Sequence, residues 1–235
     1  MLSMKDGEQL SLKSNTKSYR ISPTTLNLFR ECPRCFWLKL NQKMARPEQP
    51  SSTLPRGMDI LIKKYFDRYR PQKQPPELKG KMPGELMQDQ RLLDRWRNWR
   101  TGLQFVDRSL GGSLLFGALD ECFVDGDIYM PADYKTRGFA LKEDSIKYYQ
   151  NQLDCYTLLL LKNGYKVNNR GYLIYYILDS VAENGDSKYA VSLIEMKTNP
   201  DNAYADFKNA VERLQQPLPE LNPSCSFCSW AKNQP

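Results

Sequence analysis

Residues 117–135 read GALDECFVDGDIYMPADYK, and this stretch decides the fold and the chemistry that the sequence predicts. Two runs with the composition of extended strands, residues 113–124 and 127–137, flank Asp125-Gly126. This dipeptide is typical of a two-residue hairpin loop, because glycine adopts the positive φ that such turns require. We therefore expect a β-hairpin here.

The loop sets the register that we expect for this hairpin. If Asp125-Gly126 is the loop, Val124 faces Asp127, and counting back places Asp120 opposite Pro131. Asp133 is then the diagonal neighbour of Asp120 on the same face. A slip of one residue would turn Asp120 to the other face, because strand side chains alternate.

Alternation gives the hairpin one charged face, on which Asp133 and Lys135 lie with Asp120. The opposite face is expected to carry Leu119, Phe123, Ile128, Met130, Ala132 and Tyr134. Diagonal carboxylates, with Cβ atoms roughly 7 to 8 Å apart, can close around a magnesium ion. The ion would activate water against a phosphate, and Lys135 would orient that water or offset developing charge. The alternative is a solvent-facing strand in which Lys135 simply pairs with an aspartate.

Composition narrows the chemistry further. The chain has no histidine, which excludes Ser-His-Asp and Cys-His catalysis and histidine-ligated zinc hydrolysis. Hydrolysis must therefore use carboxylates, lysine, tyrosine and metal. A formal net charge of +7 favours a polyanionic partner through counterion release.

The rest of the chain mixes helical and extended patterns. Helices are expected at residues 22–40, 57–70, 90–105, 142–164 and 202–216, strands at 172–178 and 188–197, and loops at 41–56 and 71–84. Ser22 is a candidate helix cap, and Gly164 can end its helix in the left-handed conformation. These patterns predict an α/β domain with a small mixed sheet.

Three segments carry a family resemblance. They are Gly117-Ala118-Leu119-Asp120, Asp133-Tyr134-Lys135 and Tyr149-x-x-Gln152-Leu153-x-x-Tyr156, in this order. Their order and spacing resemble the RecB-like branch of the PD-(D/E)XK nucleases, mainly over residues 114–178. The resemblance implies a restriction-endonuclease-like core, a mixed central sheet flanked by helices, and Mg²⁺ or Mn²⁺ as cofactor.

The resemblance also implies roles for individual residues. Catalytic roles fall to Asp120, Asp133, Lys135, Gln152 and Tyr156. The expected metal ligands are Asp120, Asp133, Tyr134 and Asp59, and the expected DNA contacts are Arg137, Tyr149, Gln152 and Lys63. Tyr149, Gln152 and Tyr156 recur at i, i+3 and i+7 and so share one helical face. Tyr149 could equally pack on the sheet.

One departure from the family concerns a metal ligand. RecB-like nucleases commonly carry a histidine in an upstream helix, and residues 57–61 look like the corresponding segment. Asp59 could replace that histidine as an oxygen ligand, or could be an exposed helix acid. Glu31 and Glu121 are weaker candidates.

Four cysteines form a second candidate site. Cys32 and Cys35, and Cys225 and Cys228, make two C-x-x-C pairs that together supply a four-thiolate set. Several RecB-like nucleases join their termini with a 4Fe-4S cluster, usually with one cysteine before the core and three after it. Here the division is two and two. The resemblance favours 4Fe-4S, and structural Zn²⁺ is the alternative. The other two cysteines, Cys122 and Cys155, are expected to be buried.

Arginines and tryptophans alternate between residues 91 and 100. Such a segment could bind a nucleic-acid strand through phosphate contacts and stacking, or could be a core helix with solvated arginines. We expect a flexible segment over residues 1–20 and one nuclease domain over 21–235. The domain would comprise a helical insertion at about 57–105, a core at about 110–200 and a cysteine segment at 217–235.

The combined prediction is a metal-dependent deoxyribonuclease, an exonuclease that acts on single strands or DNA ends. Repair, recombination and CRISPR- or phage-related processing are the expected settings, with a helicase or CRISPR adaptation protein as partner. No apolar run suggests a membrane span, so a cytoplasmic location is expected. The alternatives are a non-catalytic DNA-binding or assembly module, and a zinc-bound interaction protein.

Overall fold

The computed structural model describes residues 17–47 and 52–232. Its elements are β1 (Arg20–Ile21), α1 (Pro23–Glu31), α2 (Pro33–Asn41), α3 (Leu54–Tyr69), η1 (Arg70–Gln72), η2 (Pro76–Leu78), β2 (Glu85–Leu86), α4 (Gln90–Arg97), β3 (Leu103–Asp107), η3 (Arg108–Leu110), β4 (Ser113–Gly117), β5 (Glu121–Asp125), β6 (Ile128–Arg137), α5 (Glu143–Lys147), α6 (Gln150–Lys162), β7 (Arg170–Val181), β8 (Ser187–Lys197), α7 (Pro200–Leu214) and α8 (Ser226–Lys232). Most of the segment expected to be flexible, residues 1–16 of 1–20, lies outside the described residues. Within it, Tyr19 is buried and Arg20 opens β1.

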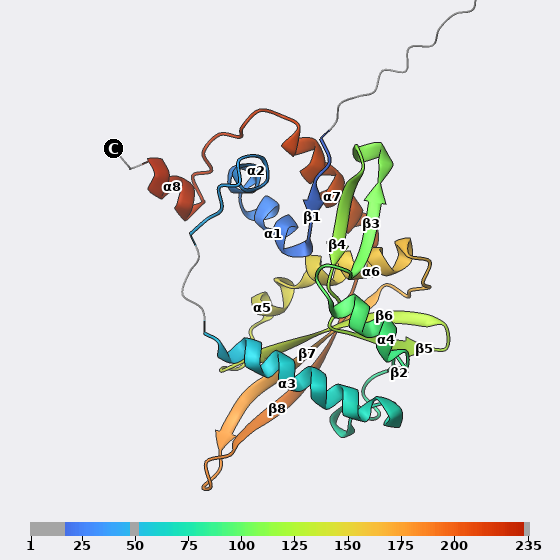
Figure 1. Ribbon diagram of the computed structural model, residues 1–235. Helices are drawn as coiled ribbons and strands as arrows, with labels where there is room; N and C mark the ends of the chain where they lie inside the picture. The colour runs from blue at the N-terminus through green and yellow to red at the C-terminus, as the bar shows by residue number, and fades with distance from the viewer. Residues whose placement is uncertain (1–16, 48–51, 233–235) are drawn as a thin grey trace, which may run out of the picture.

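The described strands form two sheets (Figure 1). The smaller has the order β1-β4-β3 and the larger the order β2-β5-β6-β7-β8. In the larger sheet β6 and β7 are parallel and the other pairs antiparallel. The expected mixed sheet flanked by helices is therefore confirmed.

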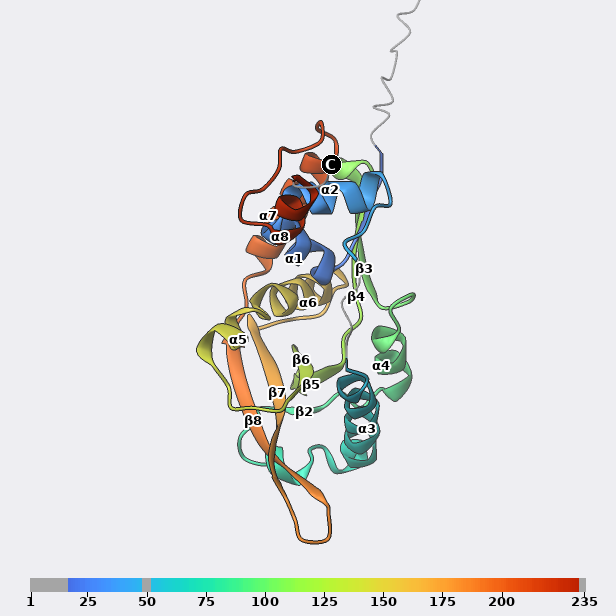
Figure 2. The same ribbon diagram turned by 90° about the vertical axis from the view of Figure 1, so that its left-hand side faces the viewer.

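Both faces of the larger sheet are packed. Helix α6 lies between this sheet and the group of α1, α2 and α7, whereas α3 covers the other face (Figures 1 and 2). On the α3 side, Ile62 and Phe66 pack against Phe123 and Met130. The expected apolar face of the hairpin is therefore present and packs on α3, and the face that carries Asp133 and Lys135 lies toward α6.

The hairpin exists, but its register differs from the prediction. Asp125 pairs with Ile128, so that the loop is Gly126-Asp127, and Cys122 lies opposite Pro131. Gly126 takes the positive φ of +61°. Each strand of the hairpin therefore pairs one residue later than predicted, and this shift keeps the side chains of the paired residues 121–125 and 128–132 on their predicted faces.

The first extended run is two strands and not one. Residues 113–117 form β4 in the smaller sheet, and residues 121–125 form β5 in the larger sheet. Ala118, Leu119 and Asp120 link the two sheets. We refer to these three residues as the sheet link. Leu119 packs with α6 and not with Phe123.

Three expected helices also differ from the observed ones. The first is interrupted at Cys32, an extended residue before Pro33 that caps α2. The basic helix ends at Arg97, and the chain turns into β3 at Leu103. The central helix divides into α5 and α6, after which Gly164 takes a φ of +86° as expected. In residues 17–47 and 52–232, no helix combines the length and apolar character needed to cross a bilayer.

Candidate functional site

Strand β6 places the D-x-K pair at the centre of the larger sheet. Asp133 pairs with Leu173 and Lys135 with Tyr175 on the parallel neighbour β7. Asp133 is almost completely buried, and its Oδ2 forms an ion pair with the Nζ of Lys135. The two charges share one face because they are two residues apart.

The sheet link brings Asp120 to the same place. One further step of the β5–β6 register, from Glu121 paired with Ala132, puts Asp120 opposite Asp133. Hydrogen bonds replace the missing strand ladder in the link: the Tyr156 hydroxyl donates to Ala118 O at 2.7 Å, and Arg97 Nε donates to Asp120 O at 2.7 Å. Asp120 is therefore held from both α4 and α6.

Gly117 allows α6 to approach this link closely. A Cβ atom at residue 117 would come within 2.9 Å of the Tyr156 ring and of the Leu159 side chain. That contact is too short for real carbon atoms, so a side chain here would push α6 and its site residues away from the strand.

Gln152 on α6 joins three of the expected site residues. Its Nε2 donates to Asp133 Oδ1 at 2.7 Å and to the Tyr156 hydroxyl at 2.8 Å, and its Oε1 accepts from Lys135 Nζ at 3.2 Å. The same amide thus fixes the orientation of the acid and of the amine. Tyr149, on the same helical face, places its ring 4.1 Å from Lys135 Nζ.

Helix α3 contributes a second amine. Lys63 Nζ lies 2.7 Å from Asp120 Oδ1 and 2.8 Å from Asp59 Oδ2. Asp59 therefore reaches Asp120 through a lysine and not as a neighbouring carboxylate. Nothing in the sequence pattern indicated that Lys63, expected to bind DNA, would lie against Asp120.

Burial and the charged groups around Asp133 shift its pKa strongly. Burial raises its pKa, the nearby Lys135 lowers it, and the Asp120 carboxylate raises it again, with a net result of about 7. Burial alone would lower the pKa of Lys135, but Asp133, Tyr149 and Asp120 together outweigh burial and raise it. A carboxylate with such a pKa in a buried pair is the kind of group found at functional sites.

The donor set fits a divalent cation. The Asp120 carboxylate raises the pKa of Asp133, and the ammonium groups of Lys63 and Lys135 form ion pairs with the two acids. Carboxylate oxygens are the ligands that Mg²⁺ and Mn²⁺ prefer. Asp120 and Asp133 would hold such an ion, and Lys63 would have to release Asp120.

Tyr134 is oriented differently from the other expected ligands. Its hydroxyl donates to Glu121 Oε2 at 3.0 Å on the α3 side of the sheet. Its phenol oxygen therefore cannot join the carboxylates. Glu121, a weaker candidate ligand, is fully buried and accepts hydrogen bonds from Arg70 and Arg97, so it is committed to a separate ionic cluster.

A hollow of about 570 Å³ adjoins the site beyond the end of β6. Its lining includes Arg137, Tyr149, Tyr148 and Phe139. Phe139 is 82% exposed and Tyr148 58% exposed. The sequence indicates Arg137 and Tyr149 as candidate contacts, but nothing in it distinguishes the two exposed rings, whose positions depend on the fold.

The basic segment of residues 91–100 divides between core and surface. Trp96 is buried and Arg97 forms ion pairs with Asp67 and Glu121, so both stabilise the fold. Trp99 is 62% exposed, with the guanidinium of Arg100 4.8 Å from its ring. The segment is thus not a continuous strand-binding surface.

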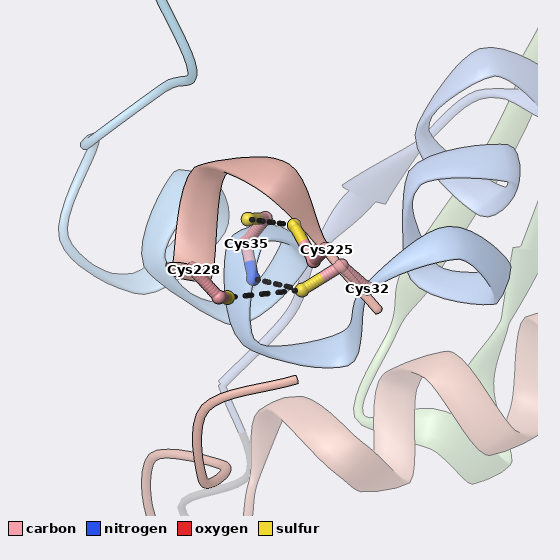
Figure 3. A group of neighbouring side chains, drawn as sticks. All are labelled: Cys32, Cys35, Cys225 and Cys228. Atoms are coloured by element: carbon pink, nitrogen blue, oxygen red, sulfur yellow. Dashed lines mark hydrogen bonds between the residues drawn. The ribbon is translucent and has the colours of Figure 1, made fainter. Parts of the chain in front are cut away.

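The four cysteines of the C-x-x-C pairs come together among α1, α2 and α8 (Figure 3). Their sulfurs all lie within 4.8 Å of one another, and all four residues are buried. This group could hold a metal ion. Cys122 and Cys155 are buried elsewhere, as expected.

One comparison with known proteins identifies a family. A family model described as the PD-(D/E)XK nuclease superfamily matches residues 20–232. Among curated proteins, none matches the chain.

Proposed function

The chain belongs to the PD-(D/E)XK nuclease superfamily, and from this premise we propose that it is a Mg²⁺- or Mn²⁺-dependent deoxyribonuclease. We propose Asp120 and Asp133 as its metal ligands and Lys135, Gln152 and Tyr156 as the other residues of its active site. The single observation that supports this most is the Gln152 amide, which contacts Asp133, Lys135 and Tyr156 at once.

Each of these residues has a distinct task in phosphodiester hydrolysis. When bound, the ion would polarise the scissile phosphate and lower the pKa of a coordinated water. Lys135 would orient the attacking water or offset charge on the phosphorane oxygens. Gln152 would keep Asp133 and Lys135 in their relative orientation, and Tyr156 would hold the sheet link that carries Asp120.

Charge and aromatic surface support single-stranded DNA, or frayed DNA ends, as substrate. Arg137 lies two residues beyond Lys135 on the same strand, where it would contact a phosphate. Phe139 and Tyr148 expose rings on which unpaired bases could stack, and such stacking contributes about 1 to 3 kcal/mol per base. A duplex would offer its bases only where it is open.

The wider role rests on the family resemblance. We propose exonucleolytic processing in repair, recombination or a CRISPR- or phage-related pathway, with a helicase or CRISPR adaptation protein as partner. Cleavage of linear but not of circular single strands would support the exonuclease assignment, and cleavage of both would contradict it.

A second candidate function is a DNA-binding module without turnover. The ion pair between Lys63 and Asp120 favours it, because a cation already covers one of the two carboxylates. The nuclease hypothesis requires this ion pair to open when a divalent ion binds.

The test is a cleavage assay on end-labelled single strands and duplexes with Mg²⁺ or Mn²⁺. Asp133→Ala and Lys135→Ala should abolish cleavage while the circular dichroism of the fold is retained. Asp127→Ala and Lys166→Ala are matched controls, because this ion pair is at the hairpin loop and largely exposed. Unchanged cleavage in both site variants, or no cleavage by the unmodified chain with either ion, would defeat the assignment.

The substrate preference has its own test. Phe139→Ala should weaken binding of single-stranded DNA by about tenfold and leave duplex binding nearly unchanged, since the ring can stack only on unpaired bases. Val106→Ala is a matched control, because Val106 is an exposed apolar residue outside the hollow. An equal loss for both substrates would contradict the single-strand preference.

A further inference from the structure

The four cysteine sulfurs form a compact group. The Cys32 and Cys228 sulfurs are 3.5 Å apart, the Cys35 and Cys225 sulfurs are 3.7 Å apart, and no pair of the four exceeds 4.8 Å. Each short distance joins one C-x-x-C pair to the other, as Figure 3 shows. The two pairs therefore interlock around a common centre.

This spacing distinguishes between the two kinds of centre that four cysteines commonly hold. Around a single tetrahedral ion with metal–sulfur bonds of about 2.3 Å, neighbouring sulfurs lie about 3.8 Å apart. In a 4Fe-4S cluster each thiolate binds a different iron at an outer corner, which spreads the four sulfurs to roughly 6 Å from one another. The observed distances match the first arrangement and are too short for the second.

The starts of two helices set the positions of the four sulfurs. Cys32 and Cys225 each immediately precede a helix, α2 and α8, and their partners Cys35 and Cys228 lie in the first turns. Leu28 and Phe227 pack against the group. Opening it to the width of a cluster would require one of these helices to move away from the other.

We infer that the four cysteines hold one tetrahedral metal ion, zinc, in place of the iron-sulfur cluster that the family resemblance implies. Thiolates in a closed tetrahedral set are a donor arrangement that Zn²⁺ favours for structural sites. Such a centre stabilises the fold, and its presence does not depend on the proposed nuclease activity.

Charge around the centre is consistent with a zinc tetrathiolate. Four thiolates and one Zn²⁺ carry a net charge of −2, which a buried site must offset. Arg46 supplies a cation: its Nη2 donates to Cys225 Sγ at 3.4 Å, and its guanidinium lies 4.7 Å from the Phe227 ring. The Cys35 backbone N–H donates to Cys32 Sγ at 3.4 Å.

The centre has a structural task that zinc can perform without redox chemistry. It joins residues 190 to 196 positions apart in the sequence. Two hydrogen bonds join the same two segments: Arg34 Nη1 donates to Pro219 O at 2.6 Å, and Asn222 Nδ2 donates to Glu31 O at 3.0 Å. The ion would therefore fix the tail that ends in α8 onto α1 and α2.

The decisive experiment measures metal and acid-labile sulfide in the full-length protein, purified without oxygen and without metal-binding tags. We expect one zinc per chain, no iron, no sulfide and no visible absorption. Four irons with four sulfides would overturn the inference, and so would a single iron that colours the protein.

Cobalt provides a second measurement on the same intact chain. Replacement of zinc by Co²⁺ should produce the intense visible bands of a tetrahedral site together with sulfur-to-cobalt charge transfer. Weak octahedral bands, or no uptake of cobalt, would contradict a single four-thiolate ion.

Variants connect the metal to these particular sulfurs. Cys228→Ser should lose most of the bound zinc, whereas Cys155→Ser should retain it, because Cys155 is equally buried but lies in α6 outside the group. Equal zinc in both variants would overturn the assignment. If Cys228→Ser proves insoluble, the metal, sulfide and cobalt measurements on the unmodified chain still decide the question.

Discussion

Asp120 and Glu121 are neighbours in the sequence, yet they belong to two different ionic clusters on opposite faces of the sheet. On one face, Asp120 and Asp133 are offset by Lys63 and Lys135. On the other, Glu121 accepts hydrogen bonds at 2.8 to 3.2 Å from two arginines, the Tyr134 hydroxyl and the Cys122 backbone. Strand alternation alone separates the two clusters.

The difference lies in the kind of cation. The guanidinium groups around Glu121 are planar and are held in place by further hydrogen bonds. The Glu121 carboxylate therefore has all its hydrogen-bond partners and cannot accept another. The lysines on the other face are point charges on flexible stems, which an incoming divalent ion can displace. A satisfied acid stabilises the fold, and an acid with an exchangeable partner is available for chemistry.

Asp133→Asn tests whether the acid with exchangeable partners serves the reaction and not the fold. Loss of one carboxylate from a metal site removes several kcal/mol of transition-state stabilisation, so the cleavage rate should fall by about 10³-fold or more. The free energy of unfolding should change by less than about 1 kcal/mol, because burial already raises the pKa of Asp133 and leaves its ionised form little net stabilising effect. Single-turnover cleavage and urea titration measure the two quantities. A stability loss as large as the activity loss would show that Asp133 is structural.

Glu121→Gln tests whether the acid bound by arginines stabilises the fold. The change leaves Arg70 and Arg97 with an uncompensated buried charge, so we expect a loss of about 3 kcal/mol or more in unfolding free energy. Urea titration at neutral pH is the measurement, with Asp133→Asn as the matched control. Stability equal to that of the unmodified chain would refute the assignment of Glu121 to the fold.

Gln152→Leu tests the proposed positioning role of Gln152, which donates a hydrogen bond to Asp133 and would not itself bind the ion. Loss of such a supporting contact typically lowers metal affinity or activity by about 10- to 100-fold. Cleavage rate against Mg²⁺ concentration should therefore shift to higher concentration. Gln150→Leu, on the same helix but bonded to Asp154 and Lys197, should leave the curve unchanged. An identical shift in both variants would argue against a positioning role.

Asp67→Asn tests the satisfied cluster through pH. Partial burial raises the pKa of Asp67, but hydrogen bonds from Arg97 and Arg70 outweigh it and lower the pKa below 3.8. The ionised form therefore stabilises the fold at pH values above the unfolded-state pKa of about 3.9, and this contribution is lost as the pH falls through the lower folded-state pKa. The difference in unfolding free energy between variant and unmodified chain should vanish in acid. A difference that persists unchanged at low pH would contradict this account.

The sequence predicted the hairpin and its charged face despite an incorrect register. The loop is one residue later than expected, yet Asp120 stays on the face of Asp133, because moving both strands by one residue preserves the alternation. The resemblance named Gln152, Tyr156 and Lys135 as site residues, and in the fold Gln152 contacts both of the others. Local pattern and family order were sufficient for these residues.

Features that depend on distant pairing could not be predicted. The run of residues 113–124 looks continuous, but β4 pairs with β1 and β3, elements without a strong strand signal of their own. The contact of Lys63 with Asp120 and the burial of Arg70 depend on where α3 packs, and periodicity within one helix does not contain that information. Pro33, by contrast, was a local signal for the break at Cys32.

The sheet link has a fixed length. Ala118 O is bonded from α6, the Leu119 backbone N–H donates to Trp96 O at 2.9 Å, and Asp120 O is bonded from Arg97. Three successive residues are thus each tied to a different fixed point. Insertions are usually tolerated between strands, but one extra residue here would break at least one tie and displace the acid while both sheets could still form. The spacing between strands is consequently as much a part of the proposed reaction centre as the identity of its side chains.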